Sequence, residues 1–439
     1  MSMEDRIMEK YSVILLGAGN RGSNYSRIIS RCPEKFNIVA VAEPVKARRE
    51  EIKKMHGISD DMCFETWEDV LKLPKFADLV LICVQDDMHY KPAMTAIDKG
   101  YNLLLEKPAA KTAEQCADIS KAAEAKGVKV LVCHVLRYSP FYKRVKELVM
   151  SGIIGDIMSA HQVEAVGNTH QSHSYVRGNW HSEKDSTPML LAKSCHDIDI
   201  LQWILDKPCK KVQSFGGLSY FKSENAPEGS PVRCIDGGCP VESTCPYNCK
   251  KLYYDDKNNN WFRGVLTHKN RKGERATDEE VMEALKTSDY GLCVFHANND
   301  VVDHQIVNME FEGGTTVSFT MNAFNRGGRY IRLFGTKGEL YANMSDSEIT
   351  VYNFEESKTE KIPVASKDES ILSGHGGGDE GIINELYDYL GDNYTGFCAA
   401  DIDTSVRNHF IVFAAEKSRH NGTVESIDEF FAEYGFENK

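Results

Sequence analysis

The sequence lacks any block rich in lysine and arginine, and acidic residues are in excess. Its 439 residues include 52 lysines and arginines against 65 aspartates and glutamates, which gives a formal net charge of −13. A chain with this charge is poorly suited to bind the phosphates of a nucleic acid or an anionic membrane. We therefore expect no nucleic acid and no membrane among its partners.

Long apolar runs are missing as well. No stretch approaches the roughly 18 apolar residues of a transmembrane helix. The N-terminal sequence MSMEDRIMEKYS is charged and lacks the apolar core of a signal peptide. We therefore expect a soluble, cytoplasmic protein, in which the 13 cysteines are reduced thiols or metal ligands rather than disulfides.

The first third of the chain alternates short apolar strands with segments of helical length. Strands are predicted at residues 11–17, 37–43, 77–84, 101–106 and 128–135, and the first helix at about 20–31. This order is typical of βαβ units with right-handed crossovers. The sequence therefore predicts an α/β fold whose residues 1–135 form a Rossmann domain with a doubly wound parallel sheet.

The turn between the first strand and the first helix has the sequence GAGNRG. A G-x-G-x-x-G turn in this position lets the backbone approach a pyrophosphate, which binds the free N–H groups at the start of the helix. We therefore predict a dinucleotide site at Gly17, Gly19, Asn20, Arg21 and Gly22.

Polar side chains at the ends of the later strands should face the same crevice, since ligands bind at the carboxyl ends of such strands. Glu43 ends the second strand, where a carboxylate accepts hydrogen bonds from ribose hydroxyls and repels a 2′-phosphate, which favours NAD over NADP. Asp86 and His89 follow the third apolar strand, and Glu106 and Lys107 follow the fourth. A lysine beside the nicotinamide can donate or accept a proton at a substrate hydroxyl.

Residues 136–439 are predicted to form a substrate-binding α/β domain. The segments 306–312, 315–324, 330–336 and 348–354 alternate apolar and polar residues, which is typical of an antiparallel sheet. Trp180 could stack on the apolar face of a sugar ring while polar neighbours such as Arg177 bind its hydroxyls. Asp379, after three glycines, is expected to cap a helix near residues 380–390.

A polar, insert-like region at about 214–303 interrupts this second domain. Within sixteen residues it contains Cys234, Cys239, Cys245 and Cys249. Four neighbouring thiols in a reducing compartment predict a tetrahedral structural zinc ion. The spacings differ from paired C-x2-C knuckles, so free thiols remain the alternative, and an iron–sulfur cluster would need shorter spacings.

The stretch LLAKSCHDIDILQWI, residues 190–204, reads as one amphipathic helix. Lys193 and His196 are three residues apart and would share a face of that helix. A histidine beside a reacting hydroxyl is suited to act as a base, because its ordinary pKa is near neutrality. The alternative is a buried, satisfied histidine. Asp197 and Asp199 are expected to orient their neighbours.

Several segments, in this order, resemble the Gfo/Idh/MocA family, which is named for glucose–fructose oxidoreductase, inositol dehydrogenase and a rhizopine-catabolism protein. They are GAGNRG, DDMHYKPAMTAIDKGYNLLLEKPAAKT, RYSPFYKRVKELVMSGIIGDI, CHDID and LFGTKGEL. The resemblance implies a Rossmann domain followed by an α/β domain with a large, mostly antiparallel sheet. It also implies NAD(P)-dependent oxidation or reduction of sugars, cyclitols or related polyols.

The same resemblance implies that Lys107 is catalytic and touches both cofactor and substrate. Arg137, at the start of the third resembling segment, is expected to bind substrate together with Trp180, Lys193 and His196. Family members commonly carry an aspartate four residues before the histidine. Ala192 stands there in this chain, so Lys193 is the third catalytic candidate.

Three functions are consistent with the sequence. The first is NAD-dependent oxidoreduction of a secondary hydroxyl in a sugar, glycoside or cyclitol, or of its ketone. The second is glycoside cleavage by transient oxidation and elimination, and the third is a non-catalytic NAD-binding sensor. The family's open sheet face usually pairs between subunits, so strands near residues 305–324 predict a homodimer or homotetramer.

Overall fold

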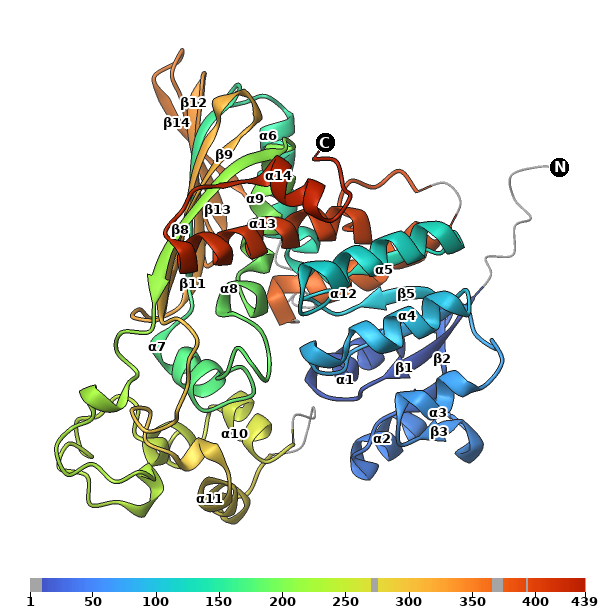
Figure 1. Ribbon diagram of the computed structural model, residues 1–439, viewed down its shortest axis with the longest axis vertical. Coiled ribbons are helices and arrows are strands. Elements are labelled where there is room, and N and C mark those ends of the chain that lie inside the picture. The colour runs from blue at the N-terminus through green and yellow to red at the C-terminus, as the bar shows by residue number, and fades with distance from the viewer. Residues whose placement is uncertain (1–9, 270–274, 365–373, 392–393, 439) are drawn as a thin grey trace.

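The computed structural model describes residues 10–269, 275–364, 374–391 and 394–438 (Figure 1). Residues 1–9, which include most of the charged N-terminal segment discussed above, lie outside this range. Within the described ranges, no helix is both long and apolar enough to cross a lipid bilayer.

The first sheet has six parallel strands in the order β3-β2-β1-β4-β5-β6. Its apolar runs are buried, with Val13 to Leu16 and Leu79 to Ile82 wholly inaccessible to solvent. The predicted doubly wound sheet is confirmed; β2 is as long as predicted and begins one residue earlier, and the other predicted strands are shorter than their apolar runs. The strands are β1 (Tyr11–Leu16), β2 (Phe36–Ala42), β3 (Cys63–Phe64), β4 (Leu79–Ile82), β5 (Asn102–Leu105) and β6 (Val130–Val132).

Helices connect these parallel strands. They are α1 (Asn20–Ile29), α2 (Lys46–His56), α3 (Trp67–Lys72), α4 (Tyr90–Asp98) and α5 (Ala113–Lys126). Helix α5 begins at a capping residue, Thr112, whose hydroxyl accepts from the N–H of Gln115, and it ends at Gly127 in the left-handed conformation. These connections bring the carboxyl ends of β1, β4 and β5 to one edge of the sheet.

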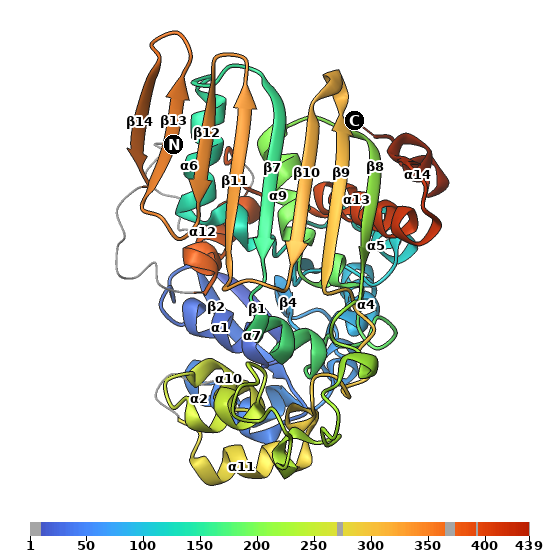
Figure 2. The ribbon, with the colours of Figure 1, turned by 90° about the vertical axis from the view of Figure 1, so that its left-hand side faces the viewer.

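The second sheet has nine strands in the order β14-β13-β12-β11-β7-β10-β9-β8-β15 (Figure 2). All neighbours are antiparallel except β7 and β10, which are parallel. The strands are β7 (Ile157–Ala165), β8 (Cys209–Gly217), β9 (His304–Phe311), β10 (Thr316–Asn322), β11 (Gly328–Gly335), β12 (Gly338–Asn343), β13 (Glu348–Asn353), β14 (Lys358–Pro363) and β15 (Glu425–Ser426).

Helices cover one face of this sheet and leave the other open, as Figure 2 shows. Along β9, Gln305, Val307 and Met309 are buried while Ile306 is exposed, so the predicted alternation is present. The helices of this domain are α6 (Pro140–Met150), α7 (Asn168–His170), α8 (Met189–Ala192), α9 (Cys195–Leu205), α12 (Gly378–Leu390), α13 (Ile402–Asn421) and α14 (Ile427–Glu433).

The C-terminal helices return to the first domain. Helix α12 packs against α1, and α13 packs against α5. Ahead of α13, the Ala400 carbonyl accepts a hydrogen bond from Val132 of β6 at 2.9 Å. This return brings residues from the end of the chain next to the glycine turn.

The predicted insert is the segment 218–303, between β8 and β9. Its helices are α10 (Asn260–Leu266) and α11 (Asp278–Thr287), and it lies at the end of the molecule away from the large sheet (Figures 1 and 2). It reaches the first domain where His268 Nδ1 lies 3.1 Å from Arg48 Nη2 of α2.

Candidate active site

The glycine turn has the backbone geometry that its sequence predicts. Gly17 has φ of +85°, and a Cβ atom there would lie 2.6 Å from the Cys83 carbonyl oxygen. A Cβ at Gly22 would lie 1.9 Å from the Gly17 carbonyl oxygen, whereas one at Gly19 would meet nothing within 4 Å. Gly17 and Gly22 therefore permit the tight turn, and Gly19 leaves its outer side open to a ligand. Helix α1 begins at Asn20 without a side-chain cap, so its first N–H groups can bind an anion.

Glu43 is buried at the end of β2, beside this turn. Its Oε2 accepts from the Ala18 N–H at 2.7 Å and its Oε1 from the Val45 N–H at 2.9 Å. Each carboxylate oxygen can accept a second hydrogen bond, so the group keeps capacity for a ribose hydroxyl. Its role in choosing NAD stays a prediction.

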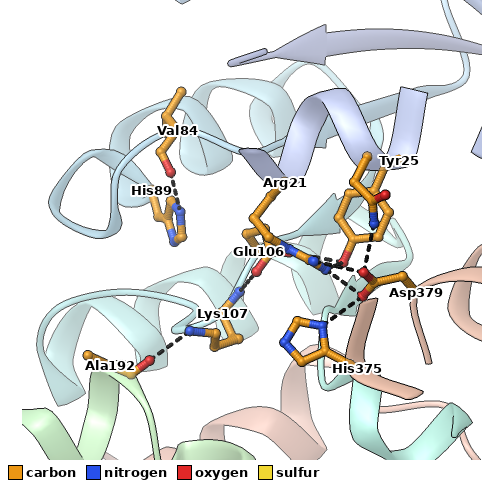
Figure 3. Close-up of polar contacts among 10 residues, drawn as sticks. Arg21, Tyr25, Val84, His89, Glu106, Lys107, Ala192, His375 and Asp379 are labelled. Carbon is orange, nitrogen blue, oxygen red and sulfur yellow. Dashed lines mark hydrogen bonds and ion pairs between the residues drawn. The ribbon is translucent and has the colours of Figure 1, made fainter. Parts of the chain in front are cut away.

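Arg21 takes a position that the sequence did not predict. Its guanidinium binds Asp379 of α12 through two hydrogen bonds of 2.8 and 2.9 Å (Figure 3). Its Nε donates to Glu106 at 2.7 Å. Burial alone raises the pKa of Glu106, but the charges of Arg21 and Lys107 outweigh it and lower that pKa. Arg21 thus ties the two domains together.

Asp379 was expected to cap the helix near residue 380, and this expectation is wrong. Helix α12 begins at Gly378, and the N-cap residue before it, Gly377, has φ of +94°. Asp379 therefore lies inside the first turn, where its carboxylate binds Arg21, Asn24 and His375. The Asp379 side chain forms an ion pair with Arg21 of the first domain and does not cap the helix.

Lys107 lies directly after β5 and follows the prediction closely. Its Nζ donates to the Ala192 carbonyl oxygen at 2.7 Å (Figure 3), so it spans the gap between the first and second domains. The peptide bond between Lys107 and Pro108 is cis. Glu106 Oε2 accepts from the Lys107 N–H at 3.1 Å, which fixes the backbone from which the lysine projects.

The stretch that was expected to form one helix is broken at the lysine. Helix α8 ends at Ala192 and α9 begins at Cys195, with Lys193 and Ser194 in a turn between them, although the Lys193 N–H still donates to the Met189 carbonyl at 3.0 Å. The break leaves the Ala192 carbonyl to Lys107, and it places Lys193 and His196 on different elements. The expectation of one continuous helix is wrong, and the shared place of the two side chains in a substrate pocket stays a prediction.

His196 is buried and close to other histidines. Its ring centroid lies 6.0 Å from that of His134 and 5.7 Å from that of His375, and His134 lies 5.6 Å from His409. In the described residues, His196 Nδ1 has no hydrogen-bond partner. Burial, and then the charge of Lys107, lowers its pKa well below the ordinary value. The imidazole is therefore neutral at neutral pH.

Lys193 belongs to a buried network of charges. Its Nζ lies 3.4 Å from Glu164 Oε1 of β7, and Arg329 Nε lies 2.5 Å from Glu164 Oε2. Arg329 also donates to Asp197 at 3.0 Å, and Asp197 accepts from Gln162 at 2.7 Å. Burial is the main cause that lowers the pKa of Lys193. Side chains from a strand, a helix break and a second strand thus meet at one place.

Asp86 and His89 are held by protein groups. Asp86 Oδ2 accepts from the indole N–H of Trp180 at 3.0 Å, which joins a predicted cofactor residue to a predicted substrate residue. His89 Nδ1 lies 2.6 Å from the Pro108 carbonyl and its Nε2 lies 3.2 Å from the Val84 carbonyl. A neutral imidazole has one N–H to donate, so we assign it to the shorter contact. His89 thereby supports the loop that carries Lys107.

Two arginines that were expected near a sugar are held by other groups of the protein. Arg137 is buried and makes two hydrogen bonds of 2.6 and 2.8 Å to Asp199, so both charges are committed to each other. Arg177 points into the insert, where it donates to the carbonyls of Leu292 and Tyr247. Asp199 orients a neighbour, as expected, but substrate contact by Arg137 has no support in this arrangement.

The cysteines of the insert do not form a ready-made metal site. Among the described residues, no group of three or more histidine, cysteine, aspartate or glutamate side chains is arranged to hold a metal ion. Zinc at Cys234, Cys239, Cys245 and Cys249 therefore remains a prediction. The Cys249 N–H donates to Cys234 Sγ at 3.4 Å.

Sequence reasoning missed Glu164, Arg329, His134 and the ion pair of Asp379. A partial signal existed for Glu164, because Gln162 and Glu164 lie two apart and therefore on the same face of a strand whose other residues on that face are apolar. Both are buried. Arg329 and Asp379 gave no comparable signal, because their partners are far away in the sequence.

Comparisons with known proteins agree with this architecture. Two models of one oxidoreductase family match the chain, the NAD-binding Rossmann fold at residues 11–134 and the C-terminal alpha/beta domain at residues 146–425. The Bacillus subtilis protein that carries the name oxidoreductase YteT is 24% identical over 340 residues, 74% of either chain. The 2,7-anhydro-N-acetylneuraminate hydratase of Escherichia coli is 26% identical over 149 residues, 34% of this chain and 39% of the hydratase.

Solved structures share the fold. The scyllo-inositol dehydrogenase of Lactobacillus casei, solved with NAD(H) and scyllo-inositol, superimposes with a TM-score of 0.61 at 16% identity over 95% of this chain and 99% of that one. The family models together cover most of the chain, in the order of the two domains described above. The chain therefore belongs to the Gfo/Idh/MocA oxidoreductase family, with an NAD-binding Rossmann domain.

Proposed function

We propose that the protein oxidises a secondary hydroxyl of a sugar, glycoside or cyclitol, or reduces the matching ketone, with NAD as the hydride partner. The observation that carries this proposal is the contact between the two domains at Lys107. Its Nζ reaches the carbonyl of Ala192, at the helix break that immediately precedes α9 and His196. A proton-transfer group of the cofactor domain and one of the second domain therefore converge.

The residues of the first domain fit the cofactor. Gly19 leaves the turn open, the N-terminus of α1 can bind a pyrophosphate, and Glu43 has acceptor capacity for the ribose. When bound there, NAD supplies a hydride acceptor or, in its reduced form, a donor. The acidic Glu43 favours NAD(H), so titration by fluorescence should give tighter binding of NADH than of NADPH. Equal affinity, or tighter binding of NADPH, would contradict this assignment.

Proton transfer is assigned to Lys107 and His196. One of the three N–H groups of the lysine is used by Ala192, which leaves two for a substrate oxygen. His196 is neutral and its Nδ1 is unpartnered, so it can accept a proton from the reacting hydroxyl. That proton can pass on to His375, since the two ring centroids are 5.7 Å apart. The Nδ1 of His375 lies 3.1 Å from Asp379, and a third of the His375 side chain is exposed to solvent.

Lys193 is assigned to substrate binding and is the third candidate for catalysis. It shares Glu164 with Arg329, which gives this wall of the site adjacent donors and acceptors. Vicinal hydroxyls of a polyol each donate and accept, and such a wall suits them. Trp180 can present its ring to the apolar face of a sugar while Asp86 holds its N–H.

The direct test is a screen of sugars, glycosides and cyclitols for NADH formation from NAD⁺, with Lys107→Ala as the control. The expected result is steady NADH formation with at least one compound class, abolished in the variant. A screen in which NADH binds tightly but the wild-type protein reduces or oxidises nothing would overturn the proposal and favour the sensor.

A second reaction uses the same groups. Oxidation of a ring carbon acidifies the neighbouring C–H, and Lys193 with Glu164 could then remove that proton so that the aglycone leaves as its alcohol. Water would add to the resulting double bond, and return of the hydride to the ketone would release the sugar. The distant relative named as a hydratase supports considering a reaction without net redox change. Release of aglycone from a glycoside without accumulation of NADH would favour this reaction over net oxidation.

We also propose that the open face of the large sheet pairs two copies of the chain. Phe215 and Ile306, which pair across β8 and β9, are each more than 40% exposed there, at 56% and 42%. A shallow depression lined by β7, β8, β9 and β10 lies on the same face. Light scattering should give a dimer or tetramer, and a monomer mass at all concentrations would refute the pairing.

A further inference from the structure

The insert has little apolar core of its own. Apart from Val301 and Val302, which join the main core, its buried apolar side chains form two small clusters, and its described residues contain only two α-helices, α10 and α11. The first cluster includes Phe221, Tyr247, Val294 and Phe295, and the second comprises Ile235, Cys249, Tyr253, Phe262, Leu266, Val281 and Leu285. Cores of this size stabilise a fold weakly unless a metal or a covalent link supports them.

A small cavity of about 20 Å³ lies where the two clusters meet. Four thiols line it, those of Cys234, Cys239, Cys245 and Cys293. Cys245 and Cys293 pack against the first cluster, and Cys234 packs against the second. Cys249 is a wholly buried member of the second cluster; it does not line the cavity, although its thiol shares a hydrogen bond with that of Cys234.

Arg177 lines the same cavity and is 2% exposed. Its Nε donates to the Leu292 carbonyl and its Nη2 to the Tyr247 carbonyl, both at 2.8 Å. Over the described ranges, its Nη1 has no hydrogen-bond partner and no carboxylate pairs with its charge. A buried, unpaired guanidinium is costly, so an anionic group beside it would be strongly favoured.

We infer that Cys234, Cys239, Cys245 and Cys293 bind one structural Zn²⁺, with Arg177 as its counter-charge. Four thiolates around Zn²⁺ form a closed tetrahedral site with a net charge of about −2. Arg177 supplies a positive charge at that position, while Glu242, a carboxylate that also lines the cavity, pairs with Lys250 at 3.6 Å. Because all four positions are taken by protein, the metal would order the insert and perform no chemistry.

A metal site that includes Cys293 would constrain a longer part of the chain than one without it. The first three thiols come from one short stretch, whereas Cys293 lies beyond α10 and α11, at the far end of the insert. A metal bound by all four closes the insert into a loop and joins its two clusters. A site made of Cys234, Cys239, Cys245 and Cys249 would order only the short stretch.

The thiols must move to reach the metal. Zinc–sulfur bonds of about 2.3 Å place neighbouring sulfurs roughly 3.8 Å apart, and no three of the described side chains are yet so arranged. Each cysteine has a single side-chain torsion with three staggered positions, which gives each sulfur a choice of positions about its backbone. The N–H of Cys249, already 3.4 Å from Cys234 Sγ, would then donate to a bound thiolate.

The test compares two cysteine variants of the full-length, tag-free protein, purified without chelator. Elemental analysis should find about one zinc per chain in the wild type and in Cys249→Ser, and less than half of that in Cys293→Ser. Wild-type protein without zinc would overturn the inference. So would a result in which Cys293→Ser keeps its zinc and Cys249→Ser loses it.

Two further measurements keep the result independent of folding. Affinity for NADH reports on the first domain, so unchanged affinity in both variants shows that a loss of zinc is local. Replacing the metal by Co²⁺ should give thiolate-to-metal charge-transfer bands in the wild type and in Cys249→Ser. The same bands at full intensity in Cys293→Ser would exclude that residue from the ligand set.

Discussion

The two sides of the candidate active site are built in different ways. On the cofactor side, the course of the backbone sets the positions of the functional groups. Gly17 and Gly22 have no room for a Cβ atom, and Lys107 is the second residue after β5. On the substrate side, positions depend on charged side chains from separate elements, as where Arg329 joins Glu164 and Asp197. A change on the cofactor side should therefore act locally, whereas one on the substrate side should disturb several partners.

The largest expected effect tests whether each side supplies one proton-transfer group. We expect Lys107→Ala and His196→Ala each to lower kcat by about 10²–10⁴-fold on a confirmed substrate, the usual loss for such a group. Binding of NADH, measured by fluorescence, should be kept in both. The exposed Lys91 of α4 and His161 on the open sheet face offer matched alanine controls. Near-normal turnover in both site variants would disprove the mechanism.

Lys193→Met separates binding from chemistry on the substrate side. Loss of a charged hydrogen bond costs about 1.5–3 kcal/mol, which corresponds to roughly 10–100-fold in KM. We expect KM to rise at least as much as kcat falls, because Lys193 is assigned to a substrate hydroxyl. Glu164 would also lose a partner at 3.4 Å, so Glu164→Gln in the same background should restore part of the affinity. An unchanged KM would place Lys193 outside the substrate site.

The contrast between the two sides also explains what sequence reasoning found. The strands of the first sheet and the turn at Gly17 are local patterns of apolar runs and glycines, and both are confirmed. The place of Lys107 after a strand depends only on its neighbours in the chain, so it could be predicted from the sequence. In the second domain, the alternation along β9 and β10 is equally local, and it predicted the antiparallel pair correctly.

What sequence reasoning missed depends on long-range partners. Arg21 binds Asp379 across the whole chain, and no local pattern indicates that pair. The helix around Lys193 breaks because the Ala192 carbonyl serves Lys107 of the other domain. Arg177 lies close in sequence to Trp180, yet its hydrogen bonds go to the distant carbonyls of Leu292 and Tyr247.

His375→Gln tests the route by which the proton would leave. Solvent can replace His375 in part, so we expect a loss in kcat on the order of tenfold, below the range for the primary base. The solvent isotope effect on kcat should increase, because proton release becomes slower. Affinity for substrate should remain. Unchanged kcat and an unchanged isotope effect would mean that His196 exchanges its proton by another path.

The smallest expected effect concerns His134, which lies between the two sides. It is wholly buried, and neither ring nitrogen has a hydrogen-bond partner in the described residues. Burial, followed by the charges of Arg137 and Lys107, lowers its pKa well below the ordinary value. The nearby Asp199 carboxylate, 3.7 Å from His134 Nδ1, is already committed to Arg137.

The sign of the pH dependence follows from these pKa values. Below an unfolded pKa of about 6.5, the unfolded chain binds a proton at His134 that the native protein does not, so the free energy of unfolding falls as the pH falls. The slope is up to about 1.4 kcal/mol per pH unit for this one group, or roughly 2 kcal/mol between pH 6.5 and pH 5.

His134→Phe should remove that share of the pH dependence and flatten the curve, although His196 and His409, whose pKa values are also lowered, still contribute. Urea unfolding at pH 8, 6.5 and 5 measures the slope, with His161→Phe on the open sheet face as the control. A slope in His134→Phe equal to that of the wild type would mean that His134 carries a proton in the folded protein. The assignment of a neutral imidazole to His134 would then have to be abandoned.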